Sequence, residues 1–288
     1  MKFFDDKPYV KKFNDLLILR DLTHNTVKSY NSMLRRYLSW VKSCQRVPED
    51  ISFAEIRDYL LFLKQRENLS NRTINAHISQ LRFFHLYVLR KPWDKYEIPY
   101  MKFNTKLPDI LTLEEVHYFI NTIPNLKHKA CVALLYSAGL RVSELCHLRY
   151  EDISRKNMRI YIRPSKSRSD RYAILSKKAL DILTKYWFSF GKPKGWLFPG
   201  TKDNCPIVSF TVSRFINDHC SFLGLEKKVT AHMLRHSFGT HLYEQGYDLL
   251  TIQKLLGHKS ASSSLIYVHL GTTTMKKLKS PFDKDESL

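Results

Sequence analysis

A short segment near residue 230 holds several side chains that can act on a phosphate group. It reads Thr-Ala-His-Met-Leu-Arg-His-Ser from Thr230 to Ser237. Helical spacing brings His232, Arg235 and His236 within about one turn of one another. A histidine can accept or donate a proton near neutral pH, and a guanidinium can bind two phosphate oxygens at once. The segment therefore indicates chemistry on a phosphate, with His232 and Arg235 as candidate reacting groups.

The same two histidines, His232 and His236, also have the spacing of zinc ligands on a helix. The zinc-protease pattern H-E-x-x-H requires a glutamate where this chain has Met233, and a third ligand is not evident. The sequence also shows no cluster of metal-binding carboxylates. We therefore expect no metal ion and no other cofactor. A surface helix with scattered polar groups is the remaining alternative.

Further residues of the same half of the chain could complete such a site. Arg141 lies in the segment Gly-Leu-Arg-Val-Ser-Glu-Leu, His258 follows Leu-Gly, and Tyr267 stands nine residues after His258. A tyrosine hydroxyl has a pKa of about 10, so it needs a base or neighbouring cations before it can attack. As it attacks a phosphate, charge develops on the non-bridging oxygens, and the forked guanidinium groups of Arg141 and Arg235 can bridge them.

This series of segments closely resembles the tyrosine recombinase (phage integrase) family. The family motifs are an arginine in a G-L-R-x-S-E-L stretch, a hairpin lysine, an H-x-L-R-H helix, an L-G-H helix end and a tyrosine nine residues past that histidine. All five occur in this order across residues 106–270. The basic N-terminal part is similar to the core-binding domain of the family, so the resemblance covers nearly the whole chain.

The resemblance implies an enzyme that cleaves and rejoins DNA without metal or ATP. Tyr267 would be the nucleophile and would form a 3′-phosphotyrosyl link, which a 5′-hydroxyl of another strand can reverse. Arg141 and Arg235 would hold the scissile phosphate. His258 would donate a further hydrogen bond to that phosphate, and His232 would accept or relay the proton of the tyrosine. The implied catalytic residues are Arg141, Lys166, His232, Arg235, His258 and Tyr267.

The hairpin lysine implied by the family is Lys166, which would protonate the leaving 5′-oxygen. Its loop reads Ser-Lys-Ser-Arg-Ser where many relatives have Gly-Lys-Gly-x-Lys. Arg168 and Arg171 lie close by in the sequence, so a different register would change the residue that fills this role.

Several of these residues also have structural interpretations. Tyr267 could be a core aromatic residue, although its spacing from His258 favours the nucleophile. Glu144 is either the partner of Arg141 or an exposed carboxylate favoured by the helix dipole. We expect His236 to be a buried, hydrogen-bonded support.

The elements that must position these residues fall into two expected domains. In the first, hydrophobic periodicity predicts amphipathic helices, and Ser70 is a plausible N-cap. A stretch with three prolines, residues 91–111, then interrupts every periodicity and indicates a linker, with a boundary near residue 105. The expected domains are residues 1–105 and 106–288, and the first-domain helices are Thr26–Trp40, Ser52–Lys64 and Ser70–Leu89.

The second domain should be mostly helical with a small β-hairpin. Thr112 and Glu115 form a capping-box pattern at its first helix, and Gly139, Gly246 and Gly257 are typical of helix ends. Arg141 is expected at the entrance of a short helix. The predicted strands are Met158–Ile162 and Tyr172–Leu175, and the predicted helices are 112–123, His128–Ala138, Arg141–His147, Lys177–Phe188, Val208–Phe222, Ala231–Gln245, Leu249–Leu256 and Ser260–Leu270. The fold class is therefore mainly α: a SAM-like core-binding domain followed by a mixed α/β catalytic domain.

Composition favours a polyanionic partner. The chain has 47 Lys and Arg against 27 Asp and Glu, a net charge of +20, which suits contacts with a phosphate backbone. We expect double-stranded DNA. The resemblance further implies a homotetramer assembled on DNA, in which the tail around Phe282 docks on a neighbouring subunit; a disordered polar tail is the alternative. It leaves open whether an accessory protein takes part.

The sequence shows neither a secretory signal nor a membrane span, so we expect a cytoplasmic protein. Its five scattered cysteines are expected to be reduced core thiols. The first helix begins within about two dozen residues of Met1, which favours the compact Xer-like class; transposon, plasmid and integron enzymes remain open beside chromosome dimer resolution. Rival functions are relaxation of supercoils by a type IB topoisomerase and a catalytically idle DNA-binding accessory.

Overall fold

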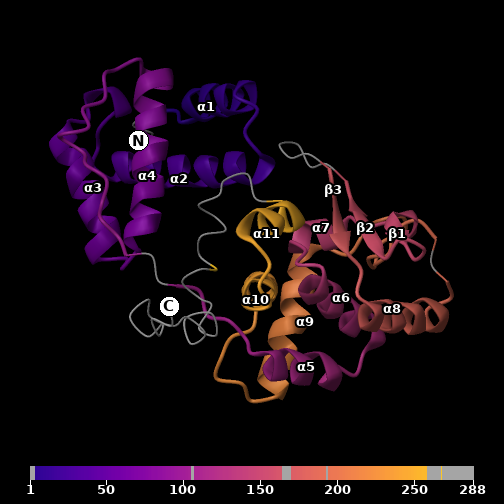
Figure 1. The fold of residues 1–288 in the computed structure, drawn as a ribbon. Helices are drawn as coiled ribbons and strands as arrows, with labels where there is room; N and C mark the ends of the chain where they lie inside the picture. The colour runs from indigo at the N-terminus through magenta and orange to yellow at the C-terminus, as the bar shows by residue number, and fades with distance from the viewer. Residues whose placement is uncertain (1–3, 105–106, 164–169, 193, 258–266, 268–288) are drawn as a thin grey trace, which may run out of the picture. The chain divides into compact units, whose positions relative to one another are not determined.

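The computed structural model describes residues 4–104, 107–163, 170–192, 194–257 and 267. The chain divides into two compact units, Met1–Thr105 and Lys106–Leu288. Both are built mainly from helices, and the second also holds a small antiparallel sheet (Figure 1). This confirms the predicted fold class.

The first unit is helical throughout its described elements. Pro48–Asp50 forms a 3-10 turn (η1), and Phe84–Leu89 continues α4 as a π-helical turn (η2). Of the helices, α1 is absent from the sequence-based prediction, although Pro8 suits its first turn. The α-helices are α1 (Lys7–Leu19), α2 (His24–Ser43), α3 (Phe53–Gln65) and α4 (Asn71–Phe83).

Local capping explains where these helices begin. Thr23, Ser52 and Ser70 each accept a hydrogen bond from a backbone N–H of the following first turn, as predicted for Ser70. The helices then bury one apolar face each, and the aromatic rings of Phe13, Tyr37 and their neighbours fill the core between them.

The second unit follows the predicted order of elements closely. Thr112 and Glu115 form the predicted capping box. The predicted helix at Ser260–Leu270 lies outside the described residues, apart from Tyr267. The elements are α5 (Leu113–Thr122), α6 (Leu126–Ser137), α7 (Val142–Cys146), η3 (Tyr150–Asp152), β1 (Ile153–Ser154), β2 (Arg159–Ile162), β3 (Arg171–Ile174), α8 (Lys177–Ser189), α9 (Ser209–Phe222), α10 (Ala231–Glu244) and α11 (Leu249–Leu256).

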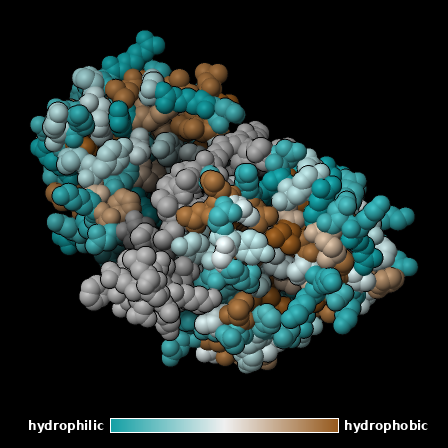
Figure 2. Space-filling model, in the orientation of Figure 1, coloured by the Kyte–Doolittle hydropathy of each residue, from teal (hydrophilic) through white to brown (hydrophobic). Residues whose placement is uncertain are grey.

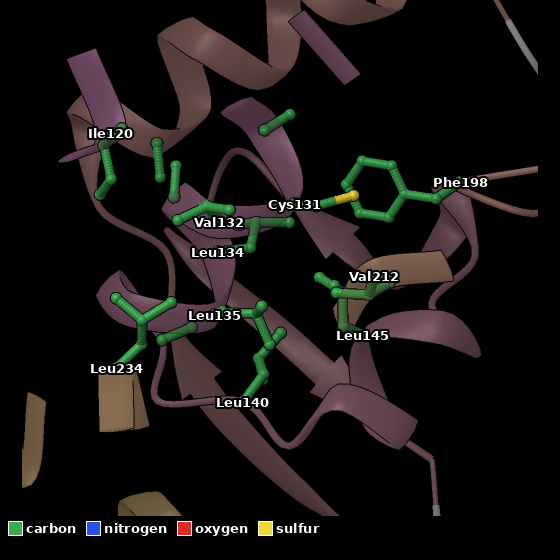
Figure 3. Close-up of a cluster of buried hydrophobic side chains, with 14 of the residues drawn as sticks. Ile120, Cys131, Val132, Leu134, Leu135, Leu140, Leu145, Phe198, Val212 and Leu234 are labelled. Atoms are coloured by element: carbon green, nitrogen blue, oxygen red, sulfur yellow. The ribbon is translucent and has the colours of Figure 1, made fainter. Parts of the chain in front are cut away.

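The core of the second unit surrounds α6. Every residue from 130 to 135 on this helix is buried, so it has no solvent-facing side over that stretch. Figure 3 shows side chains of neighbouring elements converging on it, among them Leu145 of α7, Val212 of α9 and Leu234 of α10. This core holds α7 and the start of α10, and a second apolar cluster joins the rest of α10 to α11 and Tyr267.

The sheet places the hairpin strands against this core. β2 pairs with β3 in antiparallel register, with Ile162 opposite Arg171, and the short β1, which the sequence did not predict, pairs with the other edge of β2. Ile160 and Ala173 point into the core while Arg159 and Tyr172 face solvent. Arg171 therefore stands at the first position of β3.

The cysteines differ partly from expectation. Cys131, Cys146 and Cys220 are buried, but Cys44 at the end of α2 and Cys205 in the loop before α9 are exposed, so the prediction of core thiols is wrong for these two. All five are free thiols. Figure 2 shows hydrophilic residues over most of the visible face. Among the described helices, none is both long and apolar enough to cross a membrane.

Candidate active site

Three arginines gather around one carboxylate, that of Glu144 at the start of α7. Arg141 donates from Nη1 to Oε1 at 2.7 Å and from its backbone N–H to Oε2 at 2.9 Å. Arg171 donates from its two Nη atoms to Oε1 and Oε2 at 3.2 and 3.0 Å. Nη1 of Arg235 lies 3.8 Å from Oε2. Three cations thus share one anion, which leaves a local excess of positive charge.

The same three arginines bind the carbonyl oxygens at the end of α11. A helix C-terminus carries unpaired carbonyl groups and a partial negative charge, which favours cations there. The end of this helix is therefore tied to α7, β3 and α10 at once (Figure 1). The bonds are Arg171 Nε to Leu255 (2.9 Å), Arg235 Nη2 to Leu256 (2.5 Å) and Arg141 Nη2 to Gly257 (3.0 Å).

Arg235 is the most buried member of this cluster. Its side chain is 3% exposed, against 21% for that of Arg141. Nη1 donates to the carbonyl oxygen of Gly139 at 2.6 Å. Burial, and then the nearby Arg141, lower the pKa of Arg235 to about 9. An unfavourably buried cation of this kind gains from the arrival of an anion.

Glu144 remains ionised in this setting. Burial alone raises the pKa of its carboxyl, but Arg171, the backbone N–H of Arg141 and the Arg141 charge together bring it below the ordinary value. Of the two interpretations left open by the sequence, partnership with Arg141 is the one that the structure bears out.

Tyr267 is fully buried beside this cluster. Its ring lies against Gly239 on α10, where an added Cβ would lie 2.5 Å from Cζ. Burial raises the pKa of the hydroxyl to about 12, although Arg235 and Arg141 act in the opposite direction. At neutral pH the hydroxyl is therefore protonated and needs a base before it can attack.

Two histidines of α10 lie between this tyrosine and solvent. The rings of His232 and His236 meet edge to face with centroids 4.3 Å apart, and the His236 and Tyr267 centroids are 6.1 Å apart. His232 is exposed, yet partial burial of its ring, then Arg235 and Arg141, lower its pKa. Burial, then His232 and Arg235, lower the pKa of His236 to about 4. Both rings are neutral at pH 7.

His236 differs from the expected hydrogen-bonded support. It is half-buried, and its buried Nδ1 has no hydrogen-bond partner among the residues that the structure describes. Its ring instead packs against the rings of His232 and Tyr267.

The fold therefore gathers four of the residues singled out by the sequence. Lys166 and His258 lie outside the described residues. The sequence did not assign a role to Arg171, and it left the role of Glu144 open. The four residues that lie together are Arg141, His232, Arg235 and Tyr267.

Comparison with known proteins decides the family. The model of the phage integrase family matches residues 109–273, more than half of the chain. The chain belongs to the phage integrase family. The model of the SAM-like N-terminal domain of phage integrases matches residues 10–95, within the first helical unit. The predicted family and the predicted pairing of a SAM-like domain with a catalytic domain are confirmed.

Relatives of this integrase-family chain span nearly its whole length. A protein of Sinorhizobium fredii named as an integrase/recombinase is 35% identical over 277 residues, which are 96% of this chain and 89% of that protein. A tyrosine recombinase of Thermosipho africanus is 32% identical and covers 91% of this chain and 94% of its own. The predicted enzyme class, a site-specific DNA recombinase, is confirmed.

Solved structures show the same fold. The XerA recombinase is 25% identical, with a TM-score of 0.56, and covers 96% of this chain and 100% of its own. The XerH recombinase bound to palindromic difH substrate is 22% identical, with a TM-score of 0.71, and covers 89% of this chain and 80% of its own.

Proposed function

We propose that this recombinase cleaves one DNA strand by attack of the Tyr267 hydroxyl on the scissile phosphate and later reverses that attack with a different strand. The observation that carries the proposal is the position of Tyr267, buried within electrostatic reach of Arg235 and Arg141, two cations that share the single carboxylate Glu144.

The arginine cluster has the charge that a phosphodiester needs. Each guanidinium offers five N–H donors, and Arg235 uses two of them in the hydrogen bonds made by the described residues. Arg141 and Arg235 would bind the non-bridging oxygens as negative charge grows on them. Removal of one such preorganised donor typically raises a barrier by about 3 kcal/mol.

Each proton transfer in the proposed step has a donor and an acceptor. His232, neutral at pH 7 and open to solvent, would accept the proton that Tyr267 loses, directly or through His236. Lys166 would give a proton to the leaving 5′-oxygen, and His258 would donate to the phosphate; both roles rest on the family motifs. The product is a 3′-phosphotyrosyl bond, whose energy allows rejoining without ATP. The proposed step uses no metal ion.

The proposed partner is double-stranded DNA carrying two recombination sites, with four copies of the chain assembled on it. Two relatives in fold, the XerH recombinase and the Tn1549 transposon integrase, were solved with DNA bound. The curated relatives are bacterial and archaeal proteins, so we propose the cytoplasm, where such cells keep their DNA, as the place of action.

Covalent trapping on nicked DNA tests this function. Duplexes tiled across the DNA beside the coding gene would carry a nick that lets the 5′-hydroxyl fragment diffuse away after cleavage. Denaturing electrophoresis in EDTA is expected to show a protein–DNA adduct with the wild type and none with Tyr267→Phe. Tyr247→Phe, at an exposed tyrosine of the same unit, is the matched control and is expected to form the adduct.

Absence of an adduct from the wild type on every duplex, or an adduct of equal yield from Tyr267→Phe, would contradict the proposal. Intact duplexes with two sites separate recombination from simple relaxation, because only recombination yields exchanged flanks.

A further inference from the structure

Arg171 is a largely buried cation of the second unit to which the family motifs assign no role. We propose that Arg171 is a positioning residue, which holds Arg141 in its phosphate-binding orientation by fixing Glu144 and the end of α11 together. This inference rests on the proposed function, because it gives Arg171 a task only if Arg141 binds the scissile phosphate.

Arg171 and Arg141 bind the same carboxylate, that of Glu144. Arg171 donates one hydrogen bond to each carboxylate oxygen of Glu144. Arg141 donates to the same two oxygens from its Nη1 and its backbone N–H. A two-pronged ion pair of this kind fixes the plane of the carboxylate as well as its position. The side chains of Arg171 and Glu144 are each 11% exposed, so water does little to weaken the pair.

Arg141 also donates to two carbonyl oxygens at the end of α11, those of Leu256 and Gly257. Gly257 has a φ of +62°, and an added Cβ would lie 2.8 Å from Cδ of Arg171. The aliphatic stem of Arg171 thus lies against this residue, while its Nε donates to the carbonyl oxygen of Leu255, two residues earlier. Arg171 therefore binds Glu144 and contacts Gly257, two of the three residues that accept hydrogen bonds from the Arg141 guanidinium.

The hydrogen bonds of Arg171 suit a residue that positions other protein groups. All three of its guanidinium nitrogens are engaged with protein acceptors, at 2.9 to 3.2 Å. Arg171 also stands five positions after Lys166 in the sequence, so a substitute for the hairpin lysine is the competing role that an experiment must separate.

The test compares Arg171→Gln with wild type in single-turnover formation of the covalent adduct on nicked DNA. At saturating protein the rate is expected to fall by about thirtyfold or more, while the affinity for DNA changes by less than about threefold, since whole-site binding is dominated by many phosphate contacts. Arg159→Gln, on the neighbouring strand and exposed to solvent, is the matched control and is expected to keep the wild-type rate.

Two further arms identify how Arg171 acts. A double-mutant cycle with Glu144→Gln is expected to be strongly non-additive, because both variants disturb the same arginine. A substrate with a 5′-bridging sulfur releases a thiol, whose pKa of about 8.5 removes the need for a protonated leaving group. The defect of Arg171→Gln is expected to persist on this substrate.

Each result has one meaning. A wild-type rate for Arg171→Gln overturns the inference, and so does a defect that vanishes on the sulfur substrate, which would assign Arg171 to the leaving-group proton. A wild type that forms no adduct instead overturns the proposed function.

If Arg171→Gln does not fold, the adduct-forming rate of Gly257→Ala is compared with that of Gly246→Ala. Gly246 has a similarly positive φ, but its added Cβ meets nothing within 4 Å. A larger loss of rate in Gly257→Ala supports the inference, and equal rates overturn it.

Discussion

The ring of Tyr267 lies directly on the backbone of Gly239, so that a methyl group added to this glycine would stand 2.5 Å from Cζ and 2.6 Å from Cε1. Carbon atoms in contact prefer a separation of about 3.5–4.0 Å. The described position of the tyrosine therefore requires a residue without a side chain at this point of α10.

Gly239→Ala is expected to slow covalent adduct formation by at least about tenfold, because small misplacements of a reacting group are costly. Alanine is the better helix former by about 1 kcal/mol, so loss of the helix itself would not explain the defect. Single-turnover kinetics and the far-UV circular dichroism melt measure the two effects. An unchanged rate would mean that the ring leaves Gly239 before it reacts.

The rate of adduct formation should depend on pH through His232. Partial burial and the neighbouring Arg235 and Arg141 lower the pKa of this histidine below its ordinary 6.5. The neutral, proton-accepting form therefore persists down to that lower pH, and the rate should fall only under more acidic conditions than pH 6.5. His232→Gln should be slower and lose this acid limb, whereas His147→Gln, at an exposed site, should keep it. An acid limb centred above pH 6.5 would refute this role.

Ser237 joins the start of the second unit to α10. Its hydroxyl accepts the backbone N–H of Leu111 at 2.9 Å and donates to the carbonyl oxygen of Met233. Ser237→Ala leaves a buried N–H unpaired, so the free energy of unfolding should fall by about 1–3 kcal/mol. Ser39→Ala removes a similar bond to Arg35 at an exposed position and should cost less than about 0.5 kcal/mol. Urea titrations of both variants measure the difference, and equal costs would contradict it.

His85 should make the first unit sensitive to acid. Its ring is buried beside Phe53 and Trp93, and burial lowers its pKa to about 4. Because the unfolded chain binds this proton at about 6.5, stability is expected to fall as the pH drops from 6.5 toward 4, by up to about 3 kcal/mol. His85→Phe should flatten the fall in melting temperature, with a remainder due to His77, whose pKa is also lowered to about 4 by burial. An identical pH slope in the variant would refute this account.

Signals confined to a few neighbouring residues predicted most of the fold. The capping box of Thr112 and Glu115, the N-cap Ser70 and the glycine end at Gly257 each depend on backbone groups within about four positions, and all three were found. The predicted helix Leu249–Leu256 has the observed bounds. A single sequence is enough to predict such helix ends, because the residues that form the capping hydrogen bonds lie in the same short segment.

The contacts of Arg171 could not be predicted in this way. Its partners Glu144 and Leu255 lie 27 and 84 positions away, and only the register of the hairpin decides that this arginine meets them. The exposure of Cys44 and Cys205 likewise depends on which turns the packed helices leave uncovered. Long-range packing therefore limits sequence-based prediction of the site, even where the reacting residues are recognised.

The carbonyl oxygens that bind the three arginines belong to residues 255–257, and the proposed nucleophile follows at position 267. A chain still emerging from the ribosome, or one shortened by a proteolytic cut before α11 is complete, holds its arginines without the acceptors that align them, and it lacks Tyr267. Such a fragment is therefore expected not to cleave DNA by the proposed mechanism.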